Sequence, residues 1–227
     1  AQNRGLLGRG NAGRLVLPLL GLALPIALLS RRYLAALGER DTWVIMLIYG
    51  ITFGGFVGMT SYVSLLLTAQ YGLPRLEAGY VMALLSCLGA LVRPVGGFIA
   101  DRLSGVRVLV IVLAAISLGN FAFALLMPPL AGGLALLLVL YLCFGVGNGA
   151  TFQLVPQRWR GATGVMTGIV GAAGGIGGFY LPVVMGMARQ ATGSYQLGFV
   201  TFGALAAFAL LLVSSLQQRW LAWAATA

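Results

Sequence analysis

The chain has 227 residues, of which 60% are hydrophobic and 8% are charged, and its mean hydropathy is +0.98. Soluble domains carry about 25% charged residues, so this composition excludes a water-exposed surface over most of the chain and favours the lipid bilayer as its solvent. The 14 basic residues, all arginine, outnumber the 4 acidic ones, but they stand singly or in pairs between long apolar runs, which is typical of membrane topology signals and not of a nucleic-acid-binding surface.

The first 42 residues are the least regular part of the chain. Residues 15–30 are apolar, but this run is short and contains Pro18 and Pro25. We interpret it as the end of a preceding membrane segment, with an interfacial segment or a poorly read part of the gene as the alternatives. Residues 31–41 are predicted to form a cytoplasmic linker. Because the chain begins with alanine and has no signal peptide of the usual layout, we expect it to be partial.

Six apolar runs follow, each long enough to cross about 30 Å of hydrocarbon. Because short connections make consecutive helices antiparallel neighbours, the sequence predicts an all-α, polytopic membrane protein. Its residues 43–217 are expected to form a six-helix transmembrane half-domain, after an upstream segment and linker at 1–42 and before a cytoplasmic tail at 218–227. The six runs cover residues 43–67, 78–100, 108–127, 133–156, 162–188 and 198–216.

The placement of the arginines predicts the orientation. Eight of them fall on the side of the bundle where the first run begins, and two fall on the opposite side. The positive-inside rule makes the first side cytoplasmic, so we expect a multi-pass protein of the inner (plasma) membrane with both ends of the six-helix unit in the cytoplasm. The eight are Arg31, Arg32, Arg40, Arg102, Arg107, Arg158, Arg160 and Arg219, and the two are Arg75 and Arg189.

Residues that commonly carry catalysis or bind metals are scarce. The sequence has no histidine, and both Cys87 and Cys143 lie inside apolar runs, where we interpret them as small buried residues. No disulfide framework, metal site or cofactor is therefore expected. Since no nucleophile–base pair can be assembled from so few acids and no histidine, we do not expect an enzyme.

Arg93 lies well inside the second run, after two turns of apolar residues. A charge at membrane depth costs about 2.5–3.5 kcal/mol on insertion scales, so such a residue normally faces a polar interior. Three interpretations are open: the side chain reaches the cytoplasmic headgroups near Asp101, it pairs with an acid, or it binds an anionic substrate. The third is favoured, because the six runs contain no acid and a planar guanidinium suits a planar oxyanion. Pro94 is able to kink the helix at this point.

Further candidate site residues come from the first and fourth runs. Tyr49 and Phe53 are four residues apart and share a helix face, which Phe56 and Thr60 continue. Such side chains can pack against the face of a flat anion, although an aromatic stripe is more often core packing. In the fourth run Asn148 is an uncharged polar residue at membrane depth, with helix–helix hydrogen bonding as the alternative to a binding role.

The fifth run is unusually rich in glycine, at spacings of three and four residues that give it an almost bare face. Two interpretations are open: tight packing of a neighbouring helix, or a sliding surface on which backbone N–H groups approach a substrate. The glycines are Gly161, Gly164, Gly168, Gly171, Gly174, Gly175, Gly177 and Gly178.

Several stretches resemble a known family. The stretch GFIADRLSGVR at residues 97–107 resembles the cytoplasmic loop motif of the major facilitator superfamily. YGITFGGF at 49–56, LVRPVGG at 91–97 and GIVGAAGGIGGFYLP at 168–182 resemble the seventh, eighth and eleventh helices of its nitrate/nitrite porter family. The last stretch is similar to the nitrate signature of that family. The similarity runs from about residue 41 to residue 216.

The resemblance implies a substrate site. Arg93 would be one of two substrate-binding arginines, while Tyr49 and Phe53 would line the site and Phe53 would hold the anion against an aromatic residue of another half. The glycine-rich run would flank the substrate through Gly171, Gly174 and Gly175. A second implied feature is a charge cluster that latches the outward-facing state. Its members are Gly97, Asp101, Arg102 and Arg107.

The resemblance also implies a function and a partner. Members of the family have twelve helices and bind the substrate between two six-helix halves, so an N-terminal six-helix half, on the same or a separate chain, is the expected partner. The predicted function is transport of nitrate and/or nitrite by alternating access. Because the runs contain no titratable acid, either nitrate/nitrite exchange or proton coupling through the N-terminal half is expected. The alternatives are a carrier of another small organic anion and a non-transporting, partial or degenerate membrane subunit.

Overall fold

The structure, a computed structural model, describes residues 31–225 of the chain. Within this part every regular element is a helix, and six spans are long and apolar enough to cross a membrane, which confirms the predicted all-α fold. The interpretation of residues 15–30 lies outside the described residues. A helical segment at 31–37 precedes the labelled helices. These are α2 (Arg40–Tyr71), α3 (Arg75–Leu91), α4 (Arg93–Leu103), α5 (Gly105–Leu126), α6 (Leu130–Arg158), α7 (Thr163–Thr192) and α8 (Gln196–Ala225).

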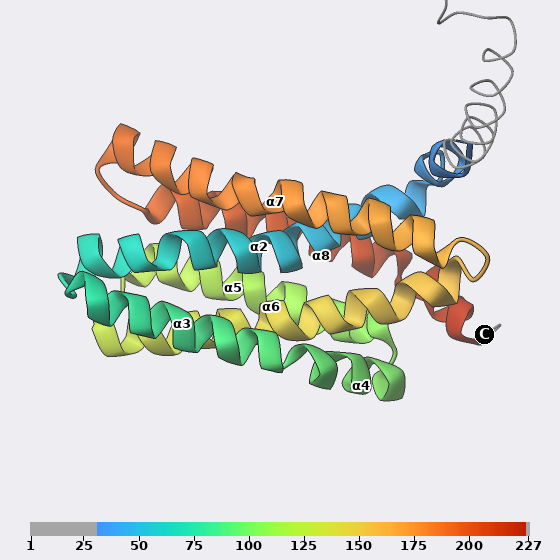
Figure 1. The fold of residues 1–227 in the computed structure, drawn as a ribbon, viewed down its shortest axis with the longest axis horizontal. Coiled ribbons are helices and arrows are strands. Elements are labelled where there is room, and N and C mark those ends of the chain that lie inside the picture. The colour runs from blue at the N-terminus through green and yellow to red at the C-terminus, as the bar shows by residue number, and fades with distance from the viewer. Residues whose placement is uncertain (1–30, 226–227) are drawn as a thin grey trace, which may run out of the picture.

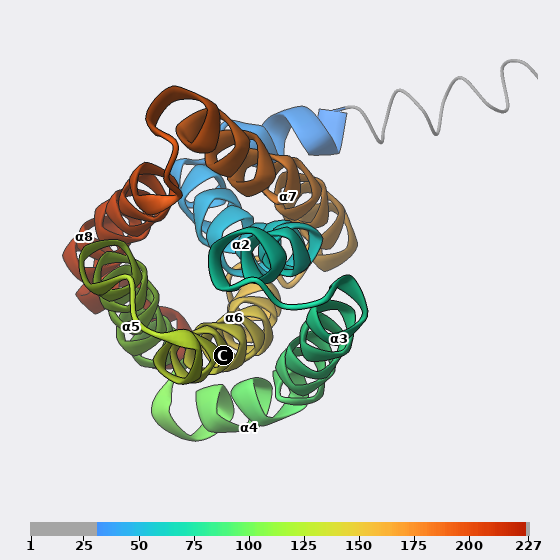
Figure 2. The ribbon, with the colours of Figure 1, turned by 90° about the vertical axis from the view of Figure 1, so that its left-hand side faces the viewer.

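The spans lie side by side along the long axis of the molecule (Figure 1). Seen from one end, α5 and α8 lie together on one side, α7 and the α3–α4 span border the other side, and α2 and α6 lie between them (Figure 2). The core is apolar and aromatic, with Tyr141, Phe144 and Phe199 fully buried. Because α2 packs against α3, α6 and α7, it is the element on which a site at the centre of the bundle is built.

The second span is interrupted at Val92, so α3 and α4 replace the single continuous helix expected over residues 78–100. Pro94 explains the interruption, since it has no N–H to donate to the carbonyl of Ala90 and its ring crowds that carbonyl. Val92 keeps right-handed dihedral angles (φ −80°, ψ −8°), so the two helices still form one membrane span. The interruption places Arg93 at the first position of α4.

Two predicted boundaries move outward. The helix α2 takes in the end of the predicted linker at 31–41, and α8 continues through most of the predicted tail at 218–227. The indole Nε1 of Trp220 donates to Asp41 Oδ1 at 3.0 Å, and both residues are buried. This contact holds the start of α2 against the end of α8. The apolar pattern of either segment alone does not predict the contact between Asp41 and Trp220.

Glycines bring α2 and α7 into backbone contact. A Cβ atom on Gly54 would lie 2.5 Å from the carbonyl carbon of Gly177, and one on Gly177 would overlap the carbonyl oxygen of Gly50. Tight helix packing, one of the two interpretations of the glycine-rich run, therefore holds at Gly177. At Gly171 and Gly175 the space is open, with no other described element within 4 Å of the Cβ position.

A second set of glycines joins α6 to the α3–α4 span. A Cβ atom on Gly145 would overlap the carbonyl oxygen of Gly89, and one on Gly149 would overlap the carbonyl oxygen of Arg93. These close approaches are possible only because glycine has no side chain. They fix the depth of the Arg93 backbone against α6.

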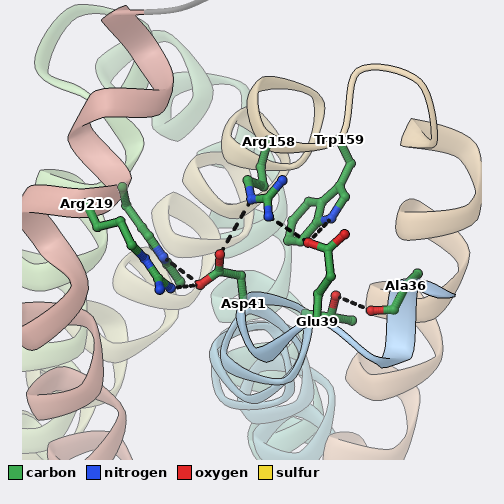
Figure 3. A network of polar contacts seen from close by, with 8 residues as sticks. Ala36, Glu39, Asp41, Arg158, Trp159 and Arg219 are labelled. Carbon is green, nitrogen blue, oxygen red and sulfur yellow. Dashed lines mark hydrogen bonds and ion pairs between the residues drawn. The ribbon is translucent and has the colours of Figure 1, made fainter.

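The arginine-rich end of the bundle carries an ion-pair network formed by Glu39, Asp41, Arg158 and Arg219 (Figure 3). Asp41 Oδ1 accepts hydrogen bonds from Arg219 and Trp220 of α8. The other oxygen, Oδ2, lies 3.5 Å from Arg158 Nε of α6. Arg158 also donates to Glu39 at 2.7 Å. The network joins the start of α2 to the ends of α6 and α8, whereas the sequence predicts that Asp41 lies in a linker.

Asp41→Asn is expected to lower the free energy of unfolding by about 1–3 kcal/mol, because it removes the charge that two arginines face and keeps the size of the side chain. This is less than for fully buried pairs, since the Arg219 side chain is 54% exposed and solvent screens it. Thermal unfolding of the purified protein in detergent measures the change. Glu77→Gln, an exposed acid at the opposite end of the bundle, is the matched control. Equal losses in both variants would contradict a structural role for the network.

Candidate functional site

Arg93 lies at mid-depth in the bundle. Thr60 Oγ1 of α2 lies 3.1 Å from Ser86 Oγ of α3, and because the two helices run antiparallel, this register puts Arg93 opposite Phe53. Phe53 is near the midpoint of α2. In agreement, the guanidinium carbon of Arg93 lies 5.3 Å from the centroid of the Phe53 ring.

The Arg93 guanidinium contacts two aromatic rings of α2. Besides Phe53 it meets Phe56, whose ring centroid lies 4.6 Å from the guanidinium carbon, and both distances are typical of cation–π contacts. The side chain therefore points towards α2 and not along its own helix towards Asp101. No ion pair within residues 31–225 includes Arg93. The direction of the side chain argues against the headgroup interpretation, and the described residues offer no acid for the pairing interpretation.

Arg93 retains unused hydrogen-bonding capacity. Its Nε is buried and has no hydrogen-bond partner in the described part of the chain. Ring faces attract the cation but offer no oxygen acceptor, so the planar fork of N–H donors remains available. A buried donor without an acceptor costs about 1–3 kcal/mol or more when charged, and a bound oxyanion would remove this cost.

Tyr49 and Phe53 form a flat aromatic wall beside Arg93. Their rings are stacked with centroids 5.1 Å apart and planes 3° from parallel, and Phe152 of α6 meets Tyr49 edge-on at 4.9 Å. Gly174 of α7 makes room for this wall, since a Cβ atom there would lie 2.6 Å from the Tyr49 ring and 2.8 Å from the Phe53 ring. The structure thus brings together Arg93, Tyr49, Phe53 and Gly174, all predicted site residues.

Asn148 is buried at the same depth. It is 3% exposed, and neither Nδ2 nor Oδ1 has a hydrogen-bond partner among the described residues. Its neighbours in α6 fix its depth, because Gly147 faces Thr52 and Gly149 faces the carbonyl of Arg93. Thr52 Oγ1 is also buried without a partner. The helix–helix hydrogen bond that was the alternative for Asn148 is therefore not formed with any described residue.

Gly171 and Gly175 stand apart from the residues around Arg93. No described residue of another element lies within 4 Å of the Cβ position of either glycine, and Gly175 is exposed. The structure does not bring these two predicted site residues to the guanidinium or to the aromatic wall. Their part in binding stays a prediction.

The predicted latch residues lie at the arginine-rich end of α4 and the start of α5. Asp101, Arg102 and Arg107 are exposed, and no ion pair within residues 31–225 includes them. The guanidinium of Arg102 instead lies 4.2 Å over the ring of Phe98. Gly97 is half-buried and faces α6. Latching by these residues stays a prediction.

Phe152 and Thr52 lie at the site but are not among the residues predicted from the sequence. Phe152 follows Asn148 by four residues, and this spacing on one helix face was a usable signal. Thr52 gave no signal, because threonine in a helix usually bonds to the carbonyl four residues earlier. Among residues 31–225 no group of three His, Cys, Asp or Glu side chains is placed to hold a metal ion.

Comparison with known proteins relates the chain to a family of membrane transporters. The sequence profile of the Major Facilitator Superfamily matches residues 9–182. This match includes the start of α7 and every residue of the site around Arg93.

Individual relatives carry names that refer to nitrate or nitrite. The chain is 38% identical over 180 residues to the nitrite extrusion protein of Bacillus subtilis (strain 168). The aligned region covers 78% of this chain and 45% of that protein. It is 41% identical over 146 residues to the probable nitrate/nitrite transporter NarK2 of Mycobacterium tuberculosis (strain ATCC 25618 / H37Rv), and the aligned region covers 64% of this chain and 37% of NarK2. Identity to the probable nitrate transporter NarT of Staphylococcus epidermidis is 28% over 213 residues, and the aligned region covers 94% of this chain and 52% of NarT. The chain spans about half the length of the curated relatives it matches.

Proposed function

Because the chain belongs to the major facilitator superfamily, we propose that it forms the C-terminal six-helix half of a transporter that moves nitrate and/or nitrite across the membrane by alternating access. The observation that carries this proposal is the position of Arg93, at mid-depth, against Phe53 and Phe56 and with Nε unpaired. The names of the relatives support nitrate and nitrite as the ligands.

The proposed roles follow from the shape of the ligand. Nitrate is flat, singly charged and able to accept two parallel N–H bonds from the fork of Arg93. The wall of Tyr49 and Phe53 would pack on its face, and Nδ2 of Asn148 would donate a further hydrogen bond. Gly174 of α7 would set the position of the wall, while Gly171 and Gly175, which lie apart from the wall in this structure, would approach the anion only if α7 moved.

An N-terminal six-helix half is the proposed partner. The two least buried spans are α3–α4 and α7. Of the 18 residues in the apolar part of each span, 17% are buried in α3–α4 and 33% in α7. They border the same side of the bundle, with α2 and α6 between them (Figure 2). A second half placed on this side would cover both spans and close the site around Arg93. The whole would be a multi-pass protein of the inner membrane, with the ion-pair network on the cytoplasmic side.

The proposal is tested by uptake into proteoliposomes that contain the complete transporter. Nitrate is expected to enter vesicles loaded with nitrite at equal pH on both sides, because none of the acids among the described residues lies at mid-depth near Arg93. Formate, acetate and lactate serve as competitors, since Arg93 alone would suit any small carboxylate. Faster uptake of a carboxylate would favour the carrier of another organic anion. Uptake that needs a pH gradient and no counter-anion would exclude exchange, and no uptake at all would favour a non-transporting subunit.

A further inference from the structure

Three hydroxyl groups from three helices form a cluster some distance along the bundle from Arg93. Thr60 Oγ1 of α2 lies 3.1 Å from Ser86 Oγ of α3, and the hydroxyl of Tyr141 in α6 donates to Thr60 Oγ1 at 3.3 Å. Ser86 precedes Arg93 by seven residues, and Thr60 follows Phe53 by seven. Two helical turns rise about 10 Å, so the backbone of Ser86 lies about 10 Å along the bundle from that of Arg93, and the backbone of Thr60 the same distance from that of Phe53. The three hydroxyl-bearing residues Thr60, Ser86 and Tyr141 are called the hydroxyl cluster.

Two hydroxyl groups of the cluster, those of Ser86 and Tyr141, make only long hydrogen bonds. Thr60 has one proton, which it donates to the carbonyl of Phe56 at 2.8 Å. Its oxygen is then the acceptor for both Ser86 and Tyr141. Both bonds, at 3.1 and 3.3 Å, are longer than the usual 2.7–2.8 Å between hydroxyl oxygens. Two converging O–H groups thus share one acceptor, and each can rotate towards a better one.

The cluster lies close to the surroundings of Arg93. Phe56 lies between them, with the guanidinium of Arg93 over its ring face and Tyr141 edge-on at 5.7 Å. Thr60 and Ser86 are half-buried and Tyr141 is fully buried, so the cluster is partly open only on the side of α2 and α3. It lies towards the end of the bundle that is opposite to the ion-pair network. In the proposed orientation this is the extracytoplasmic end.

We propose that the hydroxyl cluster is a second, transient binding site for the transported anion, on the extracytoplasmic side of Arg93. This inference rests on the proposed function. An arriving trigonal oxyanion would accept hydrogen bonds from Ser86 and Tyr141, replacing their two long bonds to Thr60. Since these donors are neutral, the anion is held less firmly than at Arg93. A site on a transport route must bind well enough to be entered and weakly enough to be left.

The test separates entry from equilibrium binding in the complete transporter. The double variant Ser86→Ala with Tyr141→Phe removes both donors and keeps the size of the side chains nearly unchanged. Uptake of nitrate from the extracytoplasmic side is expected to lose about tenfold in kcat/KM, the effect of two modest hydrogen bonds. The equilibrium Kd of nitrate, measured by titration calorimetry, is expected to stay within about twofold, because affinity at Arg93 does not depend on the route taken.

Ser117→Ala is the matched control. Ser117 is a buried hydroxyl that donates to the carbonyl of Gly203 at 3.0 Å and so joins α5 to α8, away from the site. If the hydroxyl cluster served only to hold helices together, the double variant would melt earlier, as Ser117→Ala should, and would keep its kcat/KM. That result, or a rise in Kd equal to the loss in kcat/KM, overturns the second site. Wild-type protein that neither binds nor carries nitrate would refute the proposed function itself.

Discussion

Arg93→Lys is expected to reduce nitrate uptake by about tenfold to a hundredfold in protein that still folds. Lysine keeps the positive charge but replaces a planar fork of five N–H donors by a compact ammonium group, which cannot donate two parallel bonds to a flat anion. The loss of one or two charge-assisted hydrogen bonds accounts for an effect of this size. Uptake by proteoliposomes measures it, and melting in detergent shows whether the variant is folded.

Arg189→Lys is the matched control for this change. The guanidinium of Arg189 also lies over an aromatic ring, 4.9 Å from the centroid of Tyr195, but it sits near the end of α7 and far from mid-depth. The control is expected to transport at nearly the wild-type rate. Unchanged uptake in Arg93→Lys, or equal losses in the two variants, would show that Arg93 does not bind the anion through its geometry.

Gly177→Ala is expected to destabilise the bundle by about 1–3 kcal/mol or to abolish folding, because the new methyl group overlaps the carbonyl oxygen of Gly50. The overlap is with backbone, which cannot move aside as a flexible side chain can. The helices α2 and α7 would have to separate along their whole contact. The fraction of monodisperse protein after extraction and the melting temperature in detergent measure the effect.

Gly175→Ala tests the same explanation two residues away. No other described element lies within 4 Å of its Cβ position, so a methyl group meets open space. This variant is expected to fold as well as the wild type, since alanine is also the better helix former. If both variants lose the same stability, the overlap with Gly50 is not the cause of the loss in Gly177→Ala.

The electrostatics of the described bundle single out Arg93. Two acids and two arginines pair in the ion-pair network near the ends of α2, α6 and α8. The other charged residues between 31 and 225 also lie near the ends of the membrane spans, whereas Arg93 is inside the span Arg75–Leu103 and is the one charged side chain at mid-depth in this part of the chain. An unneutralised cation in a low-dielectric surrounding attracts anions strongly. This is the physical reason for placing the substrate there.

The six spans and the presence of Arg93 inside one of them could be predicted because both depend on local properties of the sequence. Twenty apolar residues in a row suit hydrocarbon whatever surrounds them, and an arginine among them is costly in any fold. The pairing of Tyr49 with Phe53 was predictable for the same reason, since residues four apart in a helix share a face.

The partners of Asp41 could not be predicted in this way. Asp41 meets Arg158 and Arg219, which are more than one hundred residues away along the chain. The apolar pattern ends near Asp41, so the sequence placed it in a linker, and only contacts with α6 and α8 draw it into the first turn of a buried helix. The glycines of α7 show the same limit, because Gly175 and Gly177 are alike in sequence but only Gly177 lies against α2.

The sequence by itself determined that the described part of the chain has six segments long and apolar enough to cross a membrane, which runs of residues form them, and that one arginine lies well inside them. Those properties follow from the transfer of each segment between water and lipid, a free energy that sums over neighbouring residues. Only the tertiary structure decided that Phe56 and Phe53 contact Arg93, that Gly174 makes room for the aromatic wall, and that Thr60, Ser86 and Tyr141 meet. These depend on how far helices approach and turn against one another, and that is set by packing between segments distant in the chain.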